Sequence, residues 1–262
     1  MGKIPGIGKN DFFYYYSKKK HSWEAVDAYP GGYREETISF VIENRAYVGL
    51  GVSIIGNKEN GYVWFLHDDF FVFDYEKMAW ETQSIKFPGG PRSGAVAFAI
   101  NNKGYVGTGY NHGPIDNLDD FYEFDQATGW TKIASMDKGR RGAHAFVANG
   151  SAYVCFGFVG DIIKFDPKSK IWKKQPILYE EGDTSKLQMF DRSSFFSSFV
   201  LNKRGQDFVY TSNGWGYNPR KNIWKKVDYL MHGYMFTIEG QGYSMNIDEK
   251  GEFFAKTYKV ID

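Results

Sequence analysis

Residues 87–110 read FPGGPRSGAVAFAINNKGYVGTGY, and this stretch decides the fold. Residues 94–100 are small and apolar, as an innermost strand crowded around a central axis requires. The Asn101–Gly104 segment then predicts a hairpin turn, because Asn and Gly accept positive φ, and a second strand follows at residues 105–107. A third strand is expected at residues 120–125 and a fourth near Trp130. The unit therefore predicts a four-stranded antiparallel sheet.

The same unit recurs along the chain. Tryptophans 42 to 57 residues apart mark it, a loose period that fits the ~40–50 residues of a propeller blade. An acidic or amide residue precedes each tryptophan by 10 to 12 positions, and an arginine follows four of the five. The three series are Trp23, Trp80, Trp130, Trp172 and Trp224; Asp11, Asp69, Asp120, Asp161 and Asn213; and Arg34, Arg92, Arg141 and Arg192, with His232 in the fifth slot. We expect the tryptophans to pack between neighbouring sheets.

These residues resemble the kelch-repeat β-propellers of the galactose oxidase and kelch-like superfamily, and among them the kelch proteins of gut Bacteroidetes. The resemblance rests on residues 87–110 with 119–125 and extends over nearly the whole chain. It departs from the family where the usual double glycine is spread out, as Gly49-Leu50-Gly51 and Gly107-Thr108-Gly109. The resemblance implies an all-β kelch-type propeller.

The ends of the chain leave the number of blades open. Residues 11–26 predict two strands of a blade, and residues 234–259 predict three. Six blades with incomplete terminal blades is the preferred arrangement, and five blades with the two ends joined is the alternative. The predicted single domain, 1–262, divides into an incomplete blade 1–33, blades 34–91, 92–139, 140–190 and 191–231, and an incomplete closing blade 232–262.

The composition excludes several classes of function. The chain has 32 Lys+Arg against 31 Asp+Glu, so no basic field favours nucleic acid or an anionic membrane surface. No apolar run is long enough to span a membrane, and the first ten residues show no signal peptide. A monomer is expected. By resemblance the protein would be periplasmic or at the cell surface, although the given sequence shows no export signal.

Long connections predict where a binding site lies. In a propeller, the loops between second and third strands share one face with the links to the next blade. Residues 52–68, 110–119 and 175–190 elaborate that face, and the second of these segments also holds Asp116 and Asn117. Aromatic rings beside imidazoles and amides suit recognition of a sugar or peptide. The candidate ligand contacts are Trp64, His67, Tyr110 and His112.

The repeated arginines allow two interpretations. Arg34, Arg92, Arg141 and Arg192 recur near the start of each inner strand, so they could ring the mouth of the channel and bind a carboxylate. Alternatively each arginine pairs with the aspartate of the same period and locks the sheets together. The structural interpretation is preferred, because a ligand site seldom needs the same residue in every blade.

The sequence offers little catalytic chemistry. The five histidines lie in different units without metal-ligand spacing, and we expect neither a metal nor a cofactor. Galactose oxidase, a kelch-containing enzyme, uses copper with a Tyr–Cys cross-link. Here the single thiol, Cys155, lies in an apolar second strand and is interpreted as a small buried hydrophobe, so oxidase chemistry is not supported.

Two functions remain in view. The preferred one is a noncatalytic scaffold that presents its loop-rich face to a glycan or protein. The alternative is an enzyme that resembles the six-bladed kelch sialic-acid mutarotases, also named N-acetylneuraminate epimerases. Such an enzyme needs an arginine for the sugar carboxylate and an acid–base group. Arg34 or Arg92 is the candidate for the first role, and Glu35, Glu36, His144 and His232 are candidates for the second.

Overall fold

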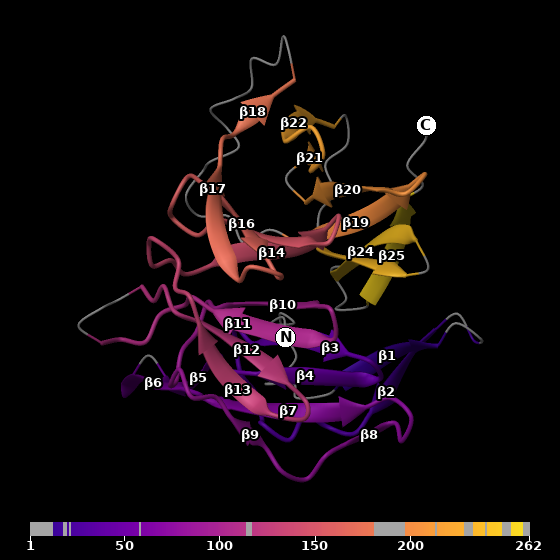
Figure 1. The fold of residues 1–262 in the computed structure, drawn as a ribbon. Coiled ribbons are helices and arrows are strands. Elements are labelled where there is room, and N and C mark those ends of the chain that lie inside the picture. The colour runs from indigo at the N-terminus through magenta and orange to yellow at the C-terminus, as the bar shows by residue number, and fades with distance from the viewer. Residues whose placement is uncertain are drawn as a thin grey trace. The chain divides into compact units, whose positions relative to one another are not determined.

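The structure of the chain is a computed structural model, and it describes residues 13–17, 20, 22–57, 59–113, 117–180, 197–212, 214–227, 233–238, 240–247 and 253–258. All regular structure within these ranges is β-strand (Figure 1). The chain divides into two compact units, Met1–Arg141 and Gly142–Asp262. Within each unit the strands form small, mostly antiparallel sheets.

The described part of the first unit holds four sheets (Figure 1). Its two larger sheets each begin with a short apolar strand and continue antiparallel in chain order. The sheets are β1 (Phe13–Ser17) with β2 (Ser22–Val26); β3 (Ile38–Ile42), β4 (Arg45–Gly49), β7 (Asp69–Asp74), β8 (Ala79–Trp80) and β9 (Ile85–Lys86); β5 (Val52–Asn57) with β6 (Gly61–Leu66); and β10 (Val96–Ile100), β11 (Lys103–Gly107), β12 (Phe121–Asp125) and β13 (Gly129–Ile133).

Among its described residues the second unit holds three sheets, also largely antiparallel. They are β14 (Ala143–Ala148), β15 (Ser151–Phe156), β16 (Ile162–Asp166) and β17 (Ile171–Gln175); β19 (Ser198–Lys203), β20 (Gln206–Thr211), β21 (Trp215–Asn218) and β22 (Ile223–Lys226) with β18 (Leu178–Tyr179) added in parallel; and β23 (Tyr234–Ile238), β24 (Gln241–Ile247) and β25 (Phe253–Tyr258). The all-β prediction is confirmed, and these antiparallel sheets are consistent with a β-propeller.

Residues 52–68, predicted to be a long loop, instead contain a hairpin. β5 and β6 pair in antiparallel register from Val52↔Leu66 to Asn57↔Gly61. The sequence predicted a loop because the segment interrupts the four-stranded period. Its Ile, Val, Tyr, Trp and Phe content nevertheless favours strand. The aromatic side chains of this segment are therefore held on a two-stranded sheet.

The turn between the first two strands of the β10–β13 sheet is shorter than predicted. Asn101 and Asn102 alone form it, with φ of 54° and 56°, while Gly104 already lies in β11. Gly104 is needed for packing instead, because a Cβ at this position would overlap the ring of Phe40 in β3. The glycine thus brings two neighbouring sheets together.

A repeated pair of rings was missed in the sequence. A phenylalanine lies directly opposite a tyrosine in five hairpins: β3–β4, β10–β11, β14–β15, β19–β20 and β23–β24. Four of these five ring pairs are stacked, with interplanar angles of 5° to 15°. The tilted fifth pair, Phe199–Tyr210, has an angle of 35°. Seven residues separate the partners in the four stacked pairs, so the spacing was visible in the sequence. The stacked pairs are Phe40–Tyr47, Phe98–Tyr105, Phe146–Tyr153 and Phe236–Tyr243.

Two tryptophans of the repeated series, Trp130 and Trp224, pack between sheets. The ring of Trp130 in β13 lies 5.5 Å from Phe70 and 5.0 Å from Phe87, both in the preceding part of the first unit. Trp224 in β22 is fully buried and lies 6.3 Å from Phe156 of the preceding sheet. These two indoles therefore pack against a preceding sheet, as predicted for the series.

Candidate functional site

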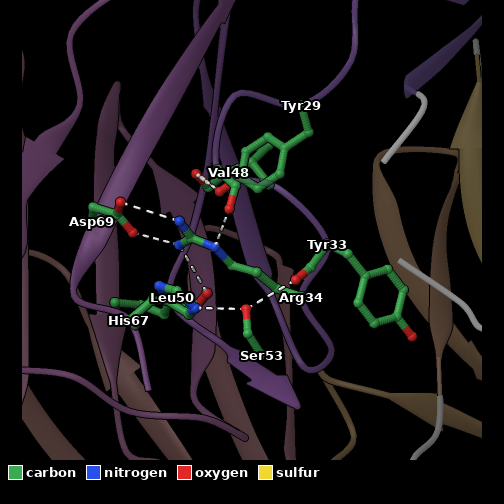
Figure 2. A network of polar contacts seen from close by, with 9 residues as sticks. Tyr29, Tyr33, Arg34, Val48, Leu50, Ser53, His67 and Asp69 are labelled. Carbon is green, nitrogen blue, oxygen red and sulfur yellow. Dashed lines mark hydrogen bonds and ion pairs between the residues drawn. The ribbon is translucent and has the colours of Figure 1, made fainter. Parts of the chain in front are cut away.

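Arg34 is held in a closed polar network at the start of the β3 sheet (Figure 2). Its two terminal nitrogens donate to the two carboxylate oxygens of Asp69, and Nε donates to the carbonyl of Gly31 at 2.9 Å. Burial opposes ionisation of Asp69, but the hydrogen bonds and the positive charge of Arg34, with smaller contributions from His67 and the backbone, together hold the pKa of Asp69 below its usual value. Figure 2 shows the guanidinium enclosed by these acceptors and by the carbonyl of Leu50.

Arg92 repeats this arrangement in the next sheet. Its terminal nitrogens donate to Asp120 at 2.6 and 3.1 Å, and Nη1 also donates to the carbonyl of Thr108 at 3.0 Å. The side chain is 0% exposed and lies over the ring of Phe87. We call Arg34–Asp69 and Arg92–Asp120 the clamps. A guanidinium with its donors used in this way is committed to the protein, which favours a structural role for both arginines.

The third arginine of the series is Arg140, and the prediction of Arg141 was wrong by one residue. The carbonyl of Arg92 accepts a hydrogen bond from the backbone N–H of Gly51. The carbonyl of Arg140 accepts the equivalent hydrogen bond from the backbone N–H of Gly109. Arg140 is also fully buried, as Arg92 is, whereas Arg141 is exposed. Two adjacent arginines cannot be told apart by spacing alone. Arg192, the fourth of the series, lies outside the described residues, as do His232 and Asp116.

Thr108, beside the second clamp, has a strained backbone conformation. Its φ is 60°, which is costly for a β-branched residue, and its buried hydroxyl has no hydrogen-bond partner among the described residues. We expect Thr108→Gly to raise the free energy of unfolding by about 1 kcal/mol, since it removes both penalties. Urea unfolding measures the change.

Leu50 supplies the matched control, because it takes the same position in the β3 sheet with φ of 56°. Its side chain is 0% exposed and belongs to the core, so Leu50→Gly should lower stability by about 2 kcal/mol despite relieving φ. A loss of stability in Thr108→Gly would show that packing of the threonine methyl outweighs the strain.

The structure joins four of the predicted site residues into one row. The ring of Trp64 in β6 lies 6.2 Å from the imidazole of His112, and that imidazole lies 4.4 Å from Tyr110. The guanidinium of Arg141 lies over the Tyr110 ring at 4.6 Å. Trp64, His112 and Arg141 are exposed, and Tyr110 is partly buried. We call these four residues the aromatic row.

The aromatic row combines three kinds of recognition group. Flat rings contact the apolar faces of sugars, an imidazole gives and takes protons, and a guanidinium binds a carboxylate. The sequence selected Arg141 as a member of the buried series, but the structure gives it this different place. Sequence spacing could not show that the hairpin β5–β6 and the segment after β11 bring Trp64 to His112.

His67 lies in the clamp network and not in the aromatic row. Its Nε2 lies 2.8 Å from Ser53 Oγ, and Ser53 donates to the carbonyl of Tyr33 at 2.9 Å (Figure 2). Burial and the nearby Arg34 charge lower the pKa of His67. Because the serine proton points to a carbonyl, His67 does not activate Ser53 as a nucleophile.

The other acid–base candidates are dispersed. Glu35 accepts a hydrogen bond from the Tyr33 hydroxyl at 2.8 Å, and Glu36 is exposed with φ of 56°. In the second unit His144 Nε2 lies 2.7 Å from Ser198 Oγ, and burial lowers the pKa of His144 to about 4. Cys155 is buried in β15. Of these groups, none lies in the row.

Two features are absent from the described residues. These residues contain no cluster of three or more His, Cys, Asp or Glu side chains suited to hold a metal ion. Nor do they contain a helix with the length and apolar character needed to cross a membrane.

The fold of this chain is similar to that of a known protein. The solved structure of YjhT matches this chain with a TM-score of 0.66 and 15% sequence identity, covering 94% of this chain and 86% of that one. This likeness shows the fold. No protein-family model matches the sequence.

Several curated relatives are named N-acetylneuraminate epimerase. The N-acetylneuraminate epimerase of Yersinia pestis is 30% identical over 191 residues, which cover 70% of this chain and 43% of that protein. Its namesake in Pasteurella multocida is 30% identical over 153 residues, covering 55% and 36%. That of Escherichia coli is 29% identical over 154 residues, covering 59% and 38%. The chain spans less than half the length of these curated relatives.

Proposed function

We propose that this protein is an N-acetylneuraminate epimerase-like enzyme that interconverts the anomers of a sialic acid. The observation that carries the proposal is the aromatic row, which sets an exposed arginine and an imidazole beside aromatic rings. The name of the relatives at 30% identity supports it over a noncatalytic scaffold.

Each member of the aromatic row has a role in this proposal. Arg141 binds the sugar carboxylate, and Trp64 packs against the apolar part of the ring or its N-acetyl group. His112 moves protons. The anomeric hydroxyl loses its proton as the bond between anomeric carbon and ring oxygen breaks, and the ring oxygen gains a proton. The open keto form then closes on its other face, so protons balance and no cofactor is needed.

The clamps do not supply the carboxylate site. Arg34 and Arg92 already bind Asp69 and Asp120, and freeing either would leave a buried carboxylate without its cation. This leaves Arg141 as the arginine of the predicted set that is both described and exposed. The proposal therefore depends on Arg141 and not on the buried series.

Anomer exchange followed by NMR tests the proposal. We expect the protein to accelerate equilibration of freshly released α-N-acetylneuraminate, and His112→Ala and Arg141→Ala each to reduce the acceleration about tenfold. The exposed Lys221→Ala is the control and should leave the rate unchanged. Arg141→Ala should also raise the substrate concentration at half-maximal rate, because it removes carboxylate binding.

Two results would count against an enzyme. No acceleration at any protein concentration would exclude mutarotation of this sugar. A rise in melting temperature with sialic acid, without faster exchange, would instead support the binding scaffold. The exposed Tyr62, Trp64 and Phe65 of the β6 strand, each at least 50% exposed, favour that second candidate.

We also propose the six-bladed arrangement in one domain, with the blade boundaries given above. The three-stranded sheet β23–β25 supports it. A composite blade in a five-bladed ring would take two strands from each end of the chain, so a third strand at the C-terminal end favours six.

A further inference from the structure

The segment that carries the imidazole of the aromatic row is fixed at its first residue, Tyr110. This residue exchanges two backbone hydrogen bonds with Ser93, donating at 2.8 Å and accepting at 3.0 Å. Its ring also lies under the guanidinium of Arg141. Tyr110 is therefore a fixed base against which the next residues turn.

His112 turns back onto this base because its backbone has a left-handed conformation. Its φ is 57°, in a region that is unfavourable for most residues with a side chain. The turn sets the imidazole 4.4 Å from the ring of Tyr110 and 6.2 Å from that of Trp64. The ring of His67 is bound by Ser53, whereas within the described ranges no hydrogen bond holds the ring of His112. Its position therefore depends on the backbone turn and on the ring contacts.

Asn111 closes this turn with its side chain. Its Oδ1 accepts a hydrogen bond at 2.9 Å from the backbone N–H of Gly113, two residues further on. Such an Asx turn is the usual way in which an asparagine stabilises a local reversal of the chain. The bond spans His112, so it opposes rotation of the His112 backbone out of the left-handed region.

We propose that Asn111 is a positioning residue, which holds the imidazole of His112 against Tyr110 and beside Trp64. Asn111 acts through the backbone and does not contact the sugar. Its effect on catalysis rests on the proposed function, but its hold on the imidazole is a property of the free protein. Because Arg141 and Trp64 bind the sugar in that proposal, loss of the hold should lower the maximal rate and leave substrate binding unchanged.

NMR of the histidine rings measures the hold directly. The ring current of Tyr110 shifts the resonances of the nearby imidazole, and His112→Gln assigns the Hε1 signal of His112. In Asn111→Ala this signal should move toward the position of an exposed histidine. Asn111→Asp keeps the acceptor and should keep the signal near its wild-type position. Asn218→Ala is the control: it removes an Asx turn of the same kind, made with Arg220 N at 3.1 Å, and should leave the His112 signal unchanged.

Gly113→Ala tests the same hydrogen bond from the donor side. A Cβ at this position would lie 3.0 Å from Asn111 Oδ1, so the acceptor has to shift by a few tenths of an ångström. We expect the His112 signal to move in the same direction as in Asn111→Ala, but by less, because the bond is weakened and not removed.

Anomer exchange of N-acetylneuraminate completes the test. Asn111→Ala should lower the maximal rate about fivefold at an unchanged half-saturating concentration, and Asn111→Asp should recover most of the rate. An unchanged His112 signal in Asn111→Ala would overturn the proposal. So would a raised half-saturating concentration, which would show that Asn111 binds the sugar itself. If the wild type accelerates no exchange, the proposed function fails, while a displaced His112 signal in Asn111→Ala still supports the positioning role.

Discussion

Replacing Arg92 by methionine is expected to lower the free energy of unfolding by about 3–5 kcal/mol, which is the cost of breaking a buried ion pair from one side. The side chain is 0% exposed, and Asp120 is 17% exposed. Methionine keeps most of the apolar contact with Phe87 but none of the donors. Asp120 and the carbonyl of Thr108 then lose the partners that compensate their burial.

Urea unfolding of four variants separates the clamp from a general effect of losing charge. Arg141→Met removes an exposed arginine that lies over the Tyr110 ring, and it should lower stability by no more than about 1 kcal/mol. In a double-mutant cycle, Arg92→Met with Asp120→Asn should be less destabilised than the sum of the single variants, because the orphaned charge is gone. A loss below about 1 kcal/mol in Arg92→Met would show that water replaces the guanidinium, and the clamp would not hold the sheets.

The contrast between Arg92 and Arg141 shows how much of the arginine arrangement the sequence predicts. Period and residue type predicted one arginine in each unit and, in the preferred interpretation, its pairing with aspartate, and both clamps show this pairing. Choosing between Arg140 and Arg141 needed the backbone hydrogen bonds. The side chains of two adjacent residues point to opposite sides of an extended chain, and a loose repeat spacing does not show which of them points inward. A one-residue error exchanges a core side chain for an exposed one.

The contacts within the aromatic row were harder to predict from the sequence than the clamps. Trp64, Tyr110 and His112 were each predicted on one loop face, and that much follows from strand order. Their contacts depend on the β5–β6 hairpin, which the period did not predict, and on positive φ of 57° at His112. Such backbone geometry is set by tertiary packing, so spacing carries little information about it.

Gly107→Ala is expected to be the next most damaging change, with a loss of about 3 kcal/mol. Gly107 ends β11 opposite Phe121, and a Cβ there would overlap the backbone carbonyl of Asp120 and the buried ring of Phe121. Neither group is a flexible chain end that can turn aside. The displaced carbonyl belongs to the residue that Arg92 binds, so the substitution should also loosen the second clamp.

Gly129→Ala is the matched control, because its Cβ would meet nothing within 4 Å although its φ is +77°. That substitution costs only the backbone strain, about 1 kcal/mol. Cys155 holds the position of Gly107 in the β14 sheet, where it faces Ile162 in place of a phenylalanine. A side chain is thus accepted where the opposing residue lacks a ring, so Gly107→Ala with Phe121→Ile should recover part of the loss. No recovery in the double variant would locate the conflict at the Asp120 carbonyl alone.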